Sequence, residues 1–151
     1  MGYGLSGFSA LAPQPVGNPR FDSFVKAMLV LSAWRYTKGY GGHTAAVMVM
    51  HCLRNRHAAG WGTWLDVIDR MPKFSATLEI PTGFPDQWNR DFVRLLSEVD
   101  GVMDSTSKDL SNKSLYFGDL NNVTNDWFLT SICRNAEHRR VADLNSLVFW
   151  D

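Results

Sequence analysis

The segment of residues 44–57 constrains the fold most, because its apolar side chains leave no broad polar face. On a helix they would cover most of the circumference: Ala46, Val47, Val49, Met50, Cys52 and Leu53. A helix that is apolar on most sides is buried among other elements. The sequence therefore predicts a central helix over residues 44–57. At 151 residues the chain is long enough to build one domain around it without disulfides or metals.

Capping residues and helical periodicity predict further helices around this segment. One begins near Asn18, with Pro19 at its first helical position, and its pattern stops at Gly39. Thr63 can cap a short helix that ends at Asp69, and Asp86 can cap a longer one. We expect the inner face of the longer helix to hold Trp88, Phe92, Val93, Leu95, Leu96, Val99 and Met103.

The two ends of the chain differ from this helical middle. Residues 1–19 are rich in Gly, Pro, Ser and Ala and predict an irregular N-terminal arm before a domain over residues 20–151. A polar loop leads to a short predicted strand at residues 114–117, Asn125 can cap a helix over residues 126–134, and residues 146–150 predict a final strand. Helices first and a short terminal β element last indicate an α+β, mostly helical fold.

Composition argues against several classes of function. The formal net charge is zero, and the basic residues are scattered, so we expect no nucleic-acid partner. Cys52 and Cys133 stand in no zinc-ligand spacing, and we expect neither a metal nor another cofactor. No apolar run approaches a membrane span, and the first residues show no secretory signal pattern.

Five separated segments match one family pattern in order. They are residues 33–40 (AWRYTKGY), 49–56 (VMHCLRNR), 73–75 (KFS), 104–117 and 147–150 (LVFW). Together they resemble the SleB-type cell-wall hydrolases, which are found in spore-forming bacteria and in bacteriophages. The resemblance covers roughly residues 20–151. It implies a lysozyme-like fold and a peptidoglycan glycan strand as ligand.

The resemblance also places the family's functional residues. The first glutamate of its motif is a general acid, and that position falls on Tyr36, whereas the second glutamate falls on Tyr40. A tyrosine, with an unperturbed pKa of about 10, donates a proton poorly at neutral pH. No Asp or Glu lies between Asp22 and Asp66, so a shifted alignment supplies no carboxylate. The groove implied by the resemblance is lined by Trp34, Tyr40, Phe74, Ser75 and Tyr116.

Two further residues of the second segment are expected to be structural. Asn55 can hydrogen-bond the backbone of a loop, and Arg56 can hold a turn.

Three functions remain open from the sequence. The missing glutamate and the retained scaffold favour a degenerate hydrolase domain that binds peptidoglycan or a protein assembly. A phage virion or accessory protein fits this role. It would be made in the host cytoplasm without a signal peptide and could dock on phage structural proteins through its arm.

The alternatives belong to other classes. An active peptidoglycan glycosidase, either a lytic transglycosylase or a muramidase, would use Glu79, which follows the Phe74-Ser75 loop, as its acid. An unrelated domain for a small ligand or a protein partner would use its aromatic residues only as core, and full burial of those rings would favour it.

Overall fold

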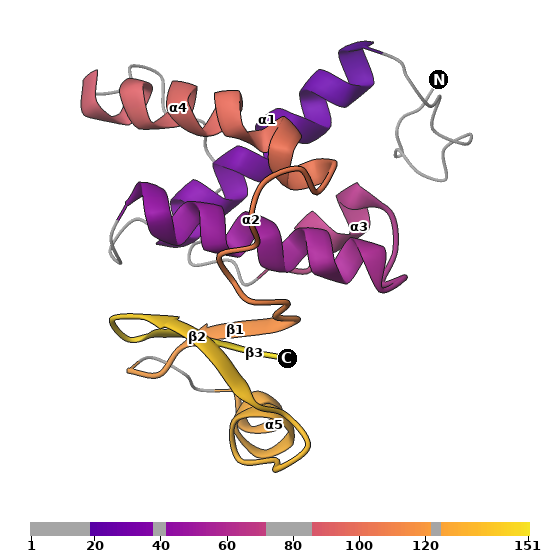
Figure 1. Ribbon diagram of the computed structural model, residues 1–151, viewed down its shortest axis with the longest axis vertical. Helices are drawn as coiled ribbons and strands as arrows, with labels where there is room; N and C mark the ends of the chain where they lie inside the picture. The colour runs from indigo at the N-terminus through magenta and orange to yellow at the C-terminus, as the bar shows by residue number, and fades with distance from the viewer. Residues whose placement is uncertain (1–18, 38–41, 72–85, 122–124) are drawn as a thin grey trace.

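The computed structural model describes residues 19–37, 42–71, 86–121 and 125–151 (Figure 1). Residues 1–18 of the predicted arm, and the predicted site residues Tyr40, Phe74, Ser75 and Glu79, lie outside the described residues. The described elements, in chain order, are α1 (Pro19–Thr37), α2 (His43–Ala58), α3 (Trp64–Asp69), α4 (Asp86–Met103), β1 (Tyr116–Asp119), α5 (Asp126–Phe128), the π-helical turn η1 (Leu129–Cys133), β2 (Arg140–Leu144) and β3 (Leu147–Trp150). The fold is mixed and mostly helical, as expected.

Helix α2 occupies the centre of the molecule, which confirms the first prediction. It contacts α1, α3, α4 and strand β1. Its buried residues come from every side of the helix: Ala45, Ala46, Val47, Met48, Val49, Met50, His51, Cys52, Leu53 and Arg56. In Figure 1 the helices α1, α3 and α4 lie on one side of α2, and the sheet with α5 lies on the other.

The buried stripe of α4 differs from the predicted one. Leu95, Val99 and Val102 are at most 1% exposed, whereas Val93 is 64% exposed. The three buried positions follow the i, i+4, i+7 spacing of a single helix face, and Val93 points about 200° away from Leu95 on the same helix. The prediction was wrong at Val93 and Leu96, because both apolar residues lie on the exposed side of the helix.

Two of the predicted helix starts are confirmed by their caps. The Thr63 hydroxyl accepts a hydrogen bond from the Asp66 backbone N–H (3.2 Å), and the Asp66 carboxylate accepts one from the Thr63 N–H (3.0 Å). This reciprocal pair fixes the start of α3. The Asn125 side chain caps α5 by accepting from the Phe128 N–H (2.9 Å).

The sheet is antiparallel in the order β1-β3-β2. Strand β3 is buried on both faces. Leu147 and Phe149 join Phe117 in the core shared with the helices, whereas Val148 and Trp150 pack with Ile132 on the other side. The final predicted strand is therefore confirmed, and it joins the helical core to the C-terminal part of the chain.

Strand β2 was not predicted from the sequence. Arg140 and Asp143 are exposed, and the strand carries no run of β-branched or aromatic residues. Strand β2 forms instead because a two-residue turn pairs it with β3. Leu144 pairs with Leu147, and Asn145 between them has a φ of 56°, a conformation that asparagine tolerates.

A close approach in this sheet gives a testable prediction. A Cβ atom added at Gly118 would lie 2.7 Å from Cε2 of Phe128. We expect Gly118→Ala to lower the free energy of unfolding by about 1–3 kcal/mol, because the ring or the strand must move. In the matched control Gly101→Ala, on α4, the nearest atom is 3.4 Å away, so stability should rise slightly. Urea unfolding of both variants is the measurement, and equal effects would contradict the clash.

Candidate functional site

Tyr36, at the position of the family's glutamate, lies in the last turn of α1 and is 6% exposed. Its ring meets the edge of the Phe117 ring on β1, with centroids 4.9 Å apart and planes at 85°. Trp34 is also 6% exposed and belongs to the same core. Neither ring face is open to a sugar, so the structure does not support a stacking role for Trp34. Burial of these two rings is what the unrelated-domain hypothesis expects.

Tyr116 has a more open place, in a row of neighbouring groups that runs from Phe117 to His138. The Arg56 guanidinium lies 5.1 Å from the Phe117 ring centroid and 4.9 Å from that of Trp61. The Trp61 ring is 5.4 Å from Tyr116, and Tyr116 is 5.2 Å from His138. Trp61, Tyr116 and His138 are half-buried. Sequence reasoning missed Trp61 and His138, since neither belongs to a recognisable pattern.

Asn55 and Arg56 have the structural roles expected of them. The Asn55 amide donates to the Ser114 carbonyl (3.0 Å), and Arg56 Nε donates to the Leu115 carbonyl (2.7 Å). Burial lowers the pKa of Arg56. These two bonds hold the chain that enters β1 against the C-terminal end of α2.

Asp109 completes this attachment. Its carboxylate accepts hydrogen bonds from Asn55 Nδ2 (2.9 Å), the Ser111 N–H and hydroxyl (2.8 and 2.7 Å) and the Lys113 N–H (2.9 Å). Burial alone would raise the pKa of Asp109, but these hydrogen bonds outweigh it and hold the pKa below its usual value. The carboxylate therefore organises the loop as a structural anion.

The buried His51 gives a prediction about pH. Its side chain is 3% exposed, and burial lowers its pKa, although nearby Asp109 opposes the shift. Because the folded pKa lies below the unfolded value of about 6.5, the unfolded chain binds the proton more readily. The free energy of unfolding should therefore fall as pH drops below about 6.5, until the folded pKa is reached.

Replacement of His51 tests this assignment. Urea unfolding of the wild-type protein and of His51→Gln, measured at steps from about pH 7.5 to about pH 5, should show a shallower pH dependence in the variant. Parallel curves for the two proteins would show that another group causes the loss.

The two glutamates that the structure describes have positions of their own. Glu98, on α4, pairs with His43 at the start of α2, and Glu98 Oε1 lies 2.9 Å from His43 Nε2. Glu137 is exposed in the turn that precedes β2. In the described part of the chain, no group of three His, Cys, Asp or Glu side chains is placed to hold a metal ion.

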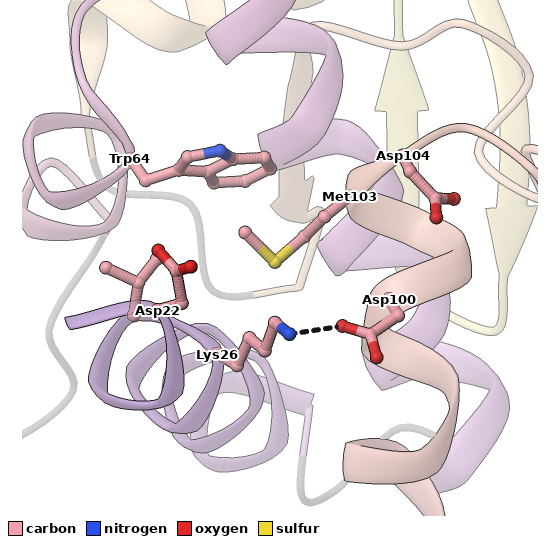
Figure 2. Close-up of a pocket in the computed structure, with 7 residues that line it drawn as sticks. Asp22, Lys26, Trp64, Asp100, Met103 and Asp104 are labelled. Carbon is pink, nitrogen blue, oxygen red and sulfur yellow. Dashed lines mark ion pairs between the residues drawn. The ribbon is translucent and has the colours of Figure 1, made fainter. Parts of the chain in front are cut away.

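A hollow of about 490 Å³ opens between α1, α3 and α4 (Figure 2). Its lining residues are Asp22, Val25, Lys26, Trp64, Asp100, Met103 and Asp104. Figure 2 shows the Trp64 ring lying across one side of the hollow, with the Met103 thioether below it and Lys26 opposite. The Trp64 ring also stacks on His57, with centroids 4.5 Å apart, and this contact helps to fix its orientation.

The polar groups of the hollow are mostly acidic. Lys26 Nζ lies 2.6 Å from Asp100 Oδ1, and this hydrogen bond is the main cause of a raised Lys26 pKa. Asp22 and Asp104 raise that pKa further through their charges. Sequence reasoning missed this site because its residues come from three separate helices and match no motif.

The hollow is separate from the position of Tyr36. Lys26 and Tyr36 are ten residues apart on α1, which places them about 15 Å apart along the helix axis. Among the described helices, none has both the length and the apolar character needed to cross a bilayer. Comparison with protein-family models, curated proteins and solved structures finds no significant match for this chain. The resemblance to SleB-type hydrolases therefore stays a prediction.

Proposed function

We propose that this chain is a degenerate hydrolase-like domain that binds cell-wall glycan in the hollow between α1, α3 and α4, without cleaving it. The observation that carries the proposal is the separation of two places on α1. The position that resembles the family's acid holds a buried tyrosine, whereas an open hollow with an aromatic wall lies at the other end of the helix.

The acid that cleavage of a glycosidic bond requires explains why a tyrosine at position 36 favours glycan binding without cleavage. Protonation of a glycosidic oxygen needs an acid that touches the bond and has a pKa near the working pH. Tyr36 is packed against Phe117 in the core and is 6% exposed, which argues against a role as the acid. General acid catalysis contributes about 10²–10⁴-fold to rate, so a domain without it retains little turnover.

The hollow has features that suit a sugar. Its volume of about 490 Å³ falls within the range of small-molecule sites, about 300–1,000 Å³. The Trp64 ring in the wall of the hollow can contact a pyranose ring, and the carboxylates and the Lys26 ammonium can hydrogen-bond hydroxyl groups. The choice of peptidoglycan as the glycan rests on the resemblance. A phage virion or accessory protein is the setting that the resemblance supports.

Digestion of purified peptidoglycan, followed by mass spectrometry of the soluble products, tests the absence of cleavage. A protein shown to be folded should release no muropeptides. Release of anhydro-muramyl or reducing muropeptides would overturn the proposal and would indicate a glycosidase. Glu79→Gln would then be the first variant to make, because loss of activity would identify Glu79 as the acid.

A further inference from the structure

A buried imidazole lies beside the carboxylate of Asp109 without a hydrogen bond between them. The side chain of His51, on α2, is 3% exposed, and its Nδ1 lies 3.9 Å from Oδ1 of Asp109, on the loop of residues 104–114. This distance is too long for a hydrogen bond. The other ring nitrogen, Nε2, is buried and has no hydrogen-bond partner among the described residues. The imidazole is therefore close to the anion that organises the loop, but is not bonded to it.

The two oxygens of Asp109 already have their full number of donors. Oδ1 accepts from the N–H and the hydroxyl of Ser111 (2.8 and 2.7 Å). Oδ2 accepts from Asn55 Nδ2 and from the Lys113 N–H, both at 2.9 Å. An ionised carboxylate offers about four lone-pair sites. A further donor can therefore bind Oδ1 only by displacing a donor of Ser111.

Protonation turns His51 into such a donor. A neutral imidazole carries one N–H, whereas the imidazolium carries two and a positive charge. Hydrogen bonds between an ionised donor and a carboxylate are stronger than those from neutral donors. The N–H and the hydroxyl of Ser111 are neutral. The Nδ1–H of the imidazolium therefore displaces them from Oδ1 of Asp109.

Ser111 cannot lose this acceptor and stay buried. The residue is 0% exposed, and a buried donor without a partner is costly. Nε2 of the imidazolium adds a second buried donor without a partner. Movement of the loop away from α2 lets water reach the Ser111 donors. The loop begins at Asp104, in the lining of the hollow, so its release also loosens one wall of the hollow.

Two charged groups act on His51 in the described part of the chain. Asp109, on the loop, favours the imidazolium, whereas Arg54, on α2 itself, disfavours it. The neighbouring Cys52 thiol is uncharged, because burial raises its pKa to about 11. Burial has the largest effect on His51 and lowers its pKa. Protonation therefore belongs to pH values below about 6.5, the ordinary pKa of histidine.

We propose that His51 is an acid-sensitive switch for the loop of residues 104–114. While the ring is neutral, Asp109 binds the loop donors and the loop stays on α2. In acid the imidazolium takes Oδ1 of Asp109 from Ser111, and the loop separates from the helix. The switch does not depend on glycan binding, so its test and the test of the proposed function are independent.

Amide hydrogen exchange, followed residue by residue by NMR, tests the switch in the full chain. Rates are measured from about pH 7.5 to about pH 5.5 and corrected for the intrinsic effect of pH. The protection factor of the Ser111 N–H should fall about threefold to tenfold, because the released state binds the proton on His51 about as readily as the unfolded chain does. The Phe128 N–H is bonded to the uncharged Asn125 side chain, and its protection factor should stay constant.

Two variants separate His51 from the other histidines. His51→Gln takes up no proton at this position, so its Ser111 protection factor should not change with pH. His138→Gln is the matched control, since His138 bonds the Asp151 carbonyl, and it should show the wild-type fall. The switch would be overturned by a constant Ser111 protection factor in the wild type. A fall that persists in His51→Gln, or is lost in His138→Gln, would also overturn it.

A titration of the wild type keeps the switch testable if His51→Gln does not fold. The ring C–H signals of His51 and the N–H signal of Ser111 are followed by NMR as pH is lowered. The two signals should shift with one midpoint, because the same proton moves both. Separate midpoints, or a Ser111 signal that does not shift, would contradict the switch.

Discussion

Replacement of Asp109 by alanine should lower the free energy of unfolding by about 3 kcal/mol. The carboxylate accepts hydrogen bonds from the Asn55 side chain, from the backbone N–H groups of Ser111 and Lys113, and from the Ser111 hydroxyl. Alanine leaves these donors without their acceptor, and Ser111 is fully buried. A hydrogen bond to a charged group contributes about 1.5–3 kcal/mol, so loss of several outweighs any relaxation of the loop.

The same loop offers a matched control. Asp104 also accepts from a backbone N–H and a hydroxyl, both of Thr106, but these groups are exposed. Asp104→Ala should therefore cost less than about 1 kcal/mol, because water replaces the lost partner. Urea unfolding of the two variants and the wild type is the measurement. Similar losses of unfolding free energy in both variants would show that burial of the Asp109 hydrogen bonds does not determine their contribution to stability.

Replacement of Phe149 by alanine should cost about 3–5 kcal/mol, the range found for large aromatic side chains in cores. Phe149 is fully buried at the centre of β3, and its ring lies 6.0 Å from that of Phe117. It joins the sheet to the helical core, so its loss opens a cavity between two parts of the molecule. A domain is typically stable by about 5–15 kcal/mol, so this variant approaches the limit of folding.

Phe24→Ala is the control of the same residue type. Phe24 lies on α1 and is 49% exposed, so its replacement should cost less than about 1 kcal/mol. Thermal unfolding compares the two variants directly. If Phe149→Ala were as stable as Phe24→Ala, the sheet and the helices would not share the core described above.

The helical half of the fold could be predicted because its signals are local. The apolar side chains of residues 44–57 cover most of the circumference, and α2 is buried over most of its length. Thr63 and Asn125 are cap residues, and both caps form. A cap or a helical stripe needs no information from distant parts of the chain.

The features that could not be predicted depend on tertiary contacts. Strand β2 forms because it can pair with β3 across the turn at Asn145, although its own residues do not favour a strand. Val93 is apolar but exposed, because the position of α4 in the core is set by Leu95, Val99 and Val102. Periodicity cannot show which of two neighbouring apolar positions faces the core.

The candidate site illustrates the same limit. The family pattern directed attention to Tyr36 and Trp34, and the structure places both rings in the core. Tyr116 has the more open position, and its partners Trp61 and His138 were not predicted. The hollow combines side chains of α1, α3 and α4, so only the packed fold brings Asp22, Trp64 and Asp100 together.

Sedimentation of the protein with purified peptidoglycan sacculi tests the central claim most directly, with three proteins compared: wild type, Trp64→Ala and Trp127→Ala. Trp127 is 60% exposed on α5 and lies outside the hollow, so it controls for the loss of a surface tryptophan. We predict that the wild type and Trp127→Ala co-sediment with intact sacculi, whereas folded Trp64→Ala stays in the supernatant. Equal sedimentation of all three, or no sedimentation of the folded wild type, would contradict glycan binding in the hollow.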